Sequence, residues 1–138
     1  MKKITAKEAA KRDAFIKSKA IQGWGCNEPA DKYDCFSFTG LSAKDLKKCI
    51  AKGWADAEDR QNNSPSIGEI LEFLEANPSF EAHGYVVTPR RDDSRISLEG
   101  VETEGAPREQ VDAFIDTFRL ADEFMFNSNG GCCRAWYD

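Results

Sequence analysis

Apolar residues in the first half of the chain recur three and four positions apart, which is the spacing of one face of an α-helix. Three helices are predicted from this spacing, the first over about residues 5–22. Each apolar series follows a residue whose side-chain oxygen can cap the first helical turn: Thr5, Ser42, and Ser64 or Ser66. A short strand is expected at 35–39, at the end of the loop that follows the first helix.

The hydrophobic pattern changes after Pro78, where β-forming residues replace the helical spacing. Four strands are expected at 81–88, 94–101, 123–127 and 132–137. A polar turn joins the first two strands, and a turn with Asn129, Gly130 and Gly131 joins the last two, so each pair is predicted to form an antiparallel hairpin. A helix that starts near Pro107 lies between the hairpins.

Side chains alternate between the two faces of a strand, which predicts what each strand presents. In the second predicted strand, Val101 falls on the polar face. In the last strand, Cys132, Arg134 and Trp136 are expected on one face and the residues between them on the other. The adjacent cysteines Cys132 and Cys133 are therefore not expected to act as a pair.

This order of elements predicts an α+β fold in a single domain that covers residues 1–138. The β-hairpin, helix, β-hairpin unit is expected to form one four-stranded antiparallel sheet in a layered arrangement, with the N-terminal helices beside it. A chain of 138 residues can bury a hydrophobic core without a disulfide or a metal. No internal repeat, low-complexity run or linker divides the sequence.

Composition and charge narrow the function. The chain has 41% hydrophobic and 31% charged residues, as soluble domains do, and no apolar run of the roughly 18 residues that a membrane helix needs. Residues 1–20 carry a net charge of +5, so the other 118 residues carry −10 of a total of −5. The basic first helix is interpreted as a solvated face. Because the acidic remainder would repel phosphates, nucleic acid is not expected as a partner.

Five cysteines without an export signal predict a cytoplasmic protein with reduced thiols. No two cysteines have the short spacing of zinc motifs, so no metal or other cofactor is expected. A metal site is one alternative, with ligands from Cys26, Cys35, Cys49, His83 and Cys132. A thiol-dependent enzyme is another, in which Arg134 lowers the pKa of Cys132 and His83 acts as base. The simpler expectation for His83 is a strand residue at a sheet edge or surface.

A protein partner is predicted rather than a metal or a substrate, and a basic protein is one candidate. Aromatic anchors and complementary charges provide much of the energy and speed of protein association. The residues expected at the interface are Glu69, Glu72, Glu75, Arg90, Arg91 and Trp136. The turn between the first two strands could also hold an anion through Arg90, Arg91 and Arg95, but internal pairing of these arginines with Asp92 and Asp93 is the preferred interpretation. The predicted function, reached by elimination, is a small acidic interaction domain of inhibitor, immunity or adaptor type without catalytic activity.

Overall fold

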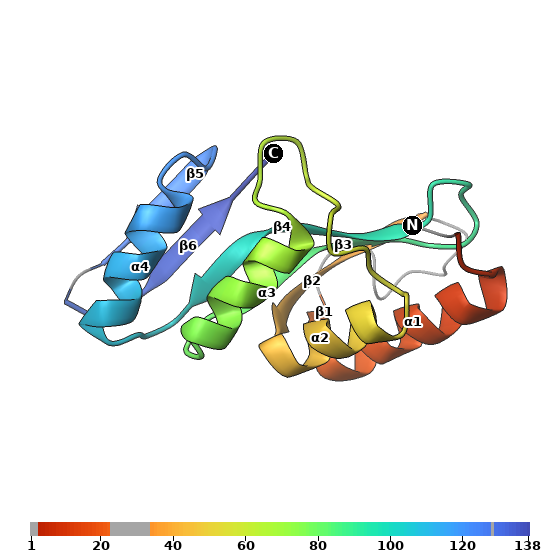
Figure 1. Cartoon of the computed structure of the whole chain (residues 1–138), viewed down its shortest axis with the longest axis horizontal. Coiled ribbons are helices and arrows are strands. Elements are labelled where there is room, and N and C mark those ends of the chain that lie inside the picture. The colour runs from red at the N-terminus through yellow and green to blue at the C-terminus, as the bar shows by residue number, and fades with distance from the viewer. Residues whose placement is uncertain (1–2, 23–33, 128) are drawn as a thin grey trace.

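The computed structural model describes residues 3–22, 34–127 and 129–138, which form four helices and six strands (Figure 1). The helices are α1 (Ala6–Lys19), α2 (Ala43–Ala51), α3 (Ile67–Ala76) and α4 (Arg108–Phe118). The strands are β1 (Ile21–Gln22), β2 (Cys35–Leu41), β3 (Glu81–Val87), β4 (Arg95–Thr103), β5 (Glu123–Phe126) and β6 (Cys133–Trp136). The first helix is shorter than predicted, because Ile21 belongs to a strand.

The strands form one antiparallel sheet in the order β1-β2-β3-β4-β6-β5. The predicted α+β architecture is confirmed, but the prediction of a four-stranded sheet is wrong. Residues 35–41 join the sheet because they pair with the outer side of β3, and β1 adds two residues to their other edge. β4 pairs with β6, so the two predicted hairpins meet within the same sheet.

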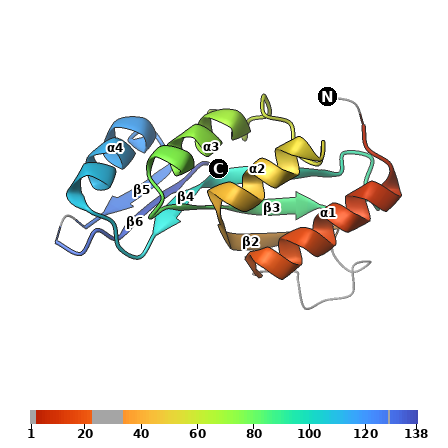
Figure 2. The same cartoon turned by 60° about the horizontal axis from the view of Figure 1, so that its bottom comes forward.

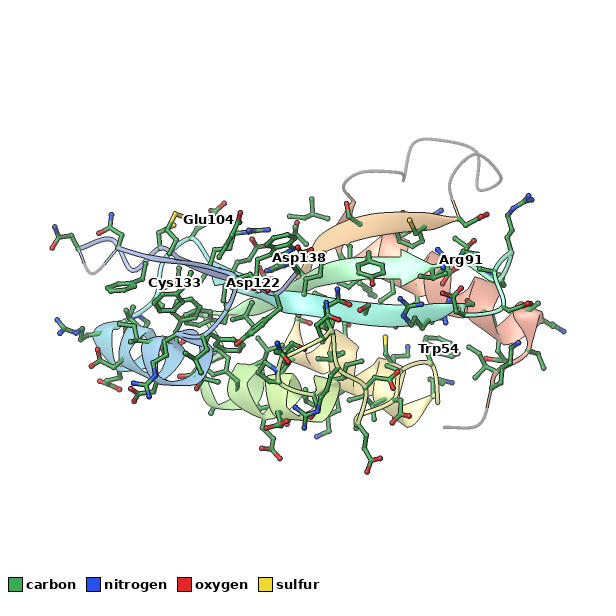
Figure 3. The ribbon with its side chains drawn as sticks, turned by 90° about the horizontal axis from the view of Figure 1, so that it is seen from above. Trp54, Arg91, Glu104, Asp122, Cys133 and Asp138 are labelled. Carbon is green, nitrogen blue, oxygen red and sulfur yellow. The ribbon has the colours of Figure 1, made fainter. Side chains whose placement is uncertain are left out.

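The four described helices lie on one face of the sheet (Figures 1 and 2). In the view from above, α2, α3 and α4 lie below the strands (Figure 3). No described helix covers the opposite face, which we call the open face. None of the described helices is long and apolar enough to cross a membrane.

Side-chain caps fix where the first three helices begin. Thr5 Oγ1 accepts a hydrogen bond from the N–H three residues further on at 3.1 Å, and Ser42 Oγ does the same at 3.2 Å. Of the two serines that the sequence left open for α3, Ser66 is the cap, and it forms a complete capping box with Glu69. Each cap satisfies a backbone N–H that a helix start leaves unpaired.

The hydrophobic core lies between the helices and the inward face of the sheet. Helices and strands contribute fully or nearly fully buried side chains, among them Ile16, Leu46, Ile70, Phe38, Val86, Leu98 and Ala135. A cluster of aromatic rings with centroids 4.9–5.7 Å apart consists of Phe73, Phe80, Phe114, Phe118 and Phe124. Because these rings come from α3, α4, β5 and the segment before β3, the cluster joins the second hairpin to the rest of the core.

A β-bulge in β4 changes which side chains face the core. Two consecutive residues of β3 pair with Leu98 and Gly100 of β4. Glu99, which lies between them, is therefore an extra residue without a partner in β3. The alternation shifts by one position after the bulge, so Val101 turns inward and is fully buried. The prediction that Val101 lies on the polar face was wrong for this reason.

Gly100 packs so closely against β6 that no side chain can be added there. A Cβ at this position would collide with the Ala135 carbonyl oxygen and stand 3.0 Å from His83 Nε2. We expect Gly100→Ala to lower the free energy of unfolding by about 1–3 kcal/mol, measured by urea denaturation. Gly105→Ala is the control, because among the described residues its Cβ would meet only Gly130 O, at 3.5 Å; its effect should stay within about 0.5 kcal/mol. Equal losses in both variants would contradict this explanation.

Candidate functional site

A groove of about 510 Å³ crosses the open face, and all six strands contribute to it. We call it the cross-strand groove; the lining residues that matter below are Ile21, Thr39, Glu81, Glu102, Glu104, Met125, Cys132 and Arg134. Figure 3 shows Glu104 on the side of the sheet away from the helices. The described lining contains three carboxylates and one guanidinium, so the groove is acidic.

Four groove residues form a row across neighbouring strands. Glu81 of β3 pairs with Glu102 of β4, which in turn pairs with Arg134 of β6. Arg134 pairs with Met125 of β5. Side chains directly opposite one another have Cβ atoms about 5 Å apart, and like charges in this arrangement destabilise a sheet. The direct pair of Glu81 and Glu102 therefore places two like charges side by side at a cost to folding.

Arg134 neutralises the row only in part. Its guanidinium lies 3.6 Å from the Glu102 carboxylate and 3.7 Å from that of Glu123. The pKa of Glu102 is nevertheless raised, chiefly because the carboxyl is half-buried, and Arg134 acts against this shift. Glu81 and Glu104 raise the same pKa further by charge repulsion. A second cation in the groove would therefore be favoured.

Two exposed apolar side chains stand on either side of the acidic row. Ile21 of β1 is 69% exposed, and Met125 of β5 is 58% exposed. Single exposed apolar residues are common, but two that flank one groove offer apolar contact area to a ligand that spans it. The arrangement suits a ligand with a positively charged group at its centre and apolar groups beside it.

His83 does not lie at a sheet edge, because β2 pairs with the outer side of β3, and it does not lie at the surface, because its ring packs over Gly100 against β6; that prediction was wrong. The side chain is only 2% exposed, and Nε2 lies 2.8 Å from the Ala135 carbonyl oxygen of β6. Since a carbonyl oxygen only accepts, Nε2 must carry the proton. Burial lowers the pKa of His83 to about 4, although the hydrogen bond opposes that shift. The ring is neutral at pH 7.

Cys132 and His83 do not form the pair that a thiol-dependent enzyme would need. The register of β4 and β6 puts Cys132 beside Glu104, whereas His83 pairs with Gly100. At about 3.3 Å per residue, these places are roughly 13 Å apart along β4. Arg134 shares a face with the thiol, but its guanidinium is held between two carboxylates. The structure therefore does not bring the predicted base, His83, to Cys132.

The cysteines of the metal alternative are also separated. Cys49 is buried in α2, and burial raises the pKa of its thiol to about 12. Cys35 begins β2, while Cys132 is exposed just before β6. Cys26 lies outside the described residues. Within residues 3–22, 34–127 and 129–138, no three His, Cys, Asp or Glu side chains form a group that could hold a metal ion.

The predicted alternation of the last strand is confirmed. The inward residues Cys133, Ala135 and Tyr137 are buried, and Cys132 is exposed. Trp136, on the open face, donates from Nε1 to a Glu99 carboxylate oxygen at 2.9 Å. Partial burial raises the pKa of Glu99, although this hydrogen bond favours the ionised form. Trp136 therefore lies on the same face as the groove but already has a polar partner.

The glutamates predicted to bind a partner lie on the helical side of the molecule. All three are exposed on α3. Glu69 caps the helix and lies 3.2 Å from Arg60, and Glu75 lies 3.6 Å from Lys47. Glu72 is exposed between them. These residues form a surface separate from the cross-strand groove.

The arginines at the turn between β3 and β4 pair with acids: two of them with Asp93, as internal pairing of the turn predicted, and Arg90 with a residue outside the turn, which was not predicted. Arg91 makes a bidentate contact with Asp93 at 2.8 and 2.6 Å, and Arg95 also reaches Asp93 at 3.0 Å. Arg90 lies 3.3 Å from Asp34, just before β2. Of the six residues predicted to contact a partner, only Trp136 shares the open face.

Sequence reasoning missed the acidic row because the bulge hides it. If the pairing that starts at the turn continued without a bulge, Glu81 would pair with Val101. The extra residue Glu99 shifts the register by one, so that Glu81 pairs with Glu102. A signal was present, since Glu102 and Glu104 follow a strand whose partner strand begins at Glu81.

No protein-family model, curated protein or solved structure matches the chain, so its function is inferred from this geometry.

Protonation of His83 should couple stability to pH. Its pKa of about 4 in the folded protein lies below the roughly 6.5 of an unfolded histidine, so the unfolded chain binds the extra proton between these values. We therefore expect His83 to lower the free energy of unfolding by about 3 kcal/mol as the pH falls from 6.5 to 4. The contribution is fully present above that window.

Urea denaturation at several pH values, with the wild-type protein and His83→Gln, measures this effect. Glutamine can still donate to the Ala135 carbonyl but does not titrate. The raised pKa values of Glu99 and Glu102 act in the opposite direction in both proteins, so the difference between the two curves reports His83. Identical pH dependence would contradict the buried, neutral ring.

Burial should also order the reactions of the cysteines with iodoacetamide. Cys132 is exposed, whereas Cys49 and Cys133 are buried with raised thiol pKa values. In the native protein we expect Cys132 to react at least about tenfold faster than either buried thiol. Peptide mass spectrometry before and after denaturation measures this difference. Fast native labelling of Cys133 would contradict the packing of β6.

Proposed function

We propose that the protein is a non-catalytic interaction domain that binds a basic segment of a protein partner in the cross-strand groove. We further propose that it acts in the cytoplasm, where its thiols stay reduced. The direct cross-strand pair of Glu81 and Glu102, with Glu104 beside it, is the observation that carries the proposal. A lysine or arginine of the partner would supply the positive charge that this row lacks.

The state of Glu102 supports a cationic ligand. Its carboxyl is half-buried and its pKa is raised, mainly by burial, despite the nearby Arg134. A partly buried carboxylate gains more from a new cation than a fully exposed one does, because water screens the pair less. The strongly acidic remainder of the chain would also steer a basic partner toward the protein.

The dimensions and flanks of the groove support a protein segment rather than a small cation. Strands lie about 4.8 Å apart, so the path from β1 to β5 measures roughly 24 Å. An extended segment of about seven residues covers this distance. Ile21 and Met125 lie near the two ends of the path, where they can contact apolar side chains of the segment.

The test uses a heptapeptide in which lysine and leucine alternate, titrated into the isotope-labelled protein and followed by NMR. We expect chemical-shift changes around Thr39, Glu81, Glu102 and Met125. The double variant Glu81→Lys, Glu104→Lys should weaken binding by roughly tenfold at low salt, because reversal turns attraction into repulsion. The same peptide with glutamate in place of lysine should not bind.

The matched control is the double variant Glu72→Lys, Glu75→Lys on α3, which changes the net charge equally. Under the proposal it binds the peptide as the wild-type protein does. Equal weakening in both double variants would show attraction to net charge alone and would overturn the groove proposal. Shifts confined to α3 would instead make the helical glutamates the binding surface.

A further inference from the structure

Arg12 of α1 is a charged side chain in the interior, with only 1% of its surface exposed. Its Nε donates to Asp13 Oδ1 at 2.8 Å. Its Nη2 donates to the Val87 carbonyl oxygen at 3.1 Å and to Ser94 Oγ at 2.8 Å. These contacts fasten α1 to the two ends of the turn between β3 and β4.

The second terminal nitrogen of Arg12, Nη1, has no hydrogen-bond acceptor among the described residues. Burial of a guanidinium N–H away from water costs free energy when no acceptor in the protein replaces the water. Thr88 Oγ1 is the only fully enclosed side-chain polar atom without a partner in the described part of the chain. Nη1 is therefore not sealed off, and Arg12 lines a cavity of about 200 Å³ between α1 and the turn.

Among the charged residues in the described wall of this cavity, basic side chains outnumber acidic ones. Lys3 and Arg91 line it together with Arg12, and Asp92 contributes the one carboxylate. Arg91 makes its bidentate contact with Asp93, which also binds Arg95, so that carboxylate is already shared by two cations. The wall thus offers several N–H donors and an excess of positive charge.

The first turns of α1 complete the wall. Ala6 and Ala9 line the cavity with small side chains, so the start of the helix lies close to its interior. Thr5 caps this helix, which is 14 residues long. The N-terminal end of such a helix carries a partial positive charge that favours an anion nearby. The first turns of α1, the buried guanidinium and the lysine therefore line one space.

We propose that this cavity binds a small oxyanion of the phosphate type. Arg12 Nη1 donates to its oxygens, and Lys3 and Arg91 add charge; an oxyanion can accept several such charge-assisted bonds at once. The space is several times the roughly 30 Å³ that one water molecule occupies. Arg91 lies at the opposite end of the sheet from Glu104 (Figure 3). The site is therefore independent of the cross-strand groove.

Inorganic phosphate and glycerol 3-phosphate are titrated separately into the full chain, at an ionic strength kept constant with sodium chloride. We expect saturable NMR shifts of the Arg12 side-chain Nε–H and of the Ser94 amide, and a higher melting temperature. Binding of both ligands identifies a phosphate-bearing small molecule, and binding of the inorganic ion alone identifies free phosphate. Either result supports the site.

Variants at the cavity wall separate a built site from general attraction of anions. Because Arg12→Gln risks unfolding the protein, Lys3→Gln and Arg91→Gln carry the test, and each should raise the apparent Kd about fivefold or more. Lys44→Gln, at an exposed position of α2, removes the same charge and should leave the Kd unchanged. Absence of saturable binding, or equal effects of all three variants, would overturn the proposal.

Discussion

The close approach of Gly100, His83 and Ala135 holds the two halves of the sheet together. Because Gly100 has no side chain, the Ala135 carbonyl of β6 can reach the imidazole N–H of β3 across the bulged strand between them. This contact fixes the position of β6 against β4 and hence places Arg134 beside Glu102. The acidic row on the open face is therefore a consequence of how tightly the backbone packs at one point.

The distribution of helices over the sheet decides where a ligand can bind. All four described helices share one face, and their apolar residues and the phenylalanine cluster fill the space beneath them. On the other face, the side chains that point away from the core can contact a ligand, except for buried ones such as His83. One layer thus supplies the stability of the domain and the opposite surface supplies its polar chemistry.

Local signals in the sequence predicted the local structure well. Thr5, Ser42 and Ser66 cap their helices because a cap involves residues only three positions apart. Pairing between distant strands leaves no such signal, so the sequence predicted neither the position of β2 next to β3 nor the burial of His83. The candidate site depends on both the β4–β6 pair and the bulge at Glu99, and for this reason its glutamates were not recognised as one group.

The order of strands in the sheet also bears on how the chain assembles. β3 and β4 meet at residues only eight positions apart, Val87 and Arg95, whereas β6 reaches β4 across 30 positions, from Thr103 to Cys133. β2 pairs with β3 only after a loop that contains α2 and α3 has closed. Since closing a longer loop costs more chain entropy, the topology favours early formation of the β3–β4 pair. φ-value analysis can test this order of folding events. The central hairpin then serves as the template on which strands from both ends of the chain add last.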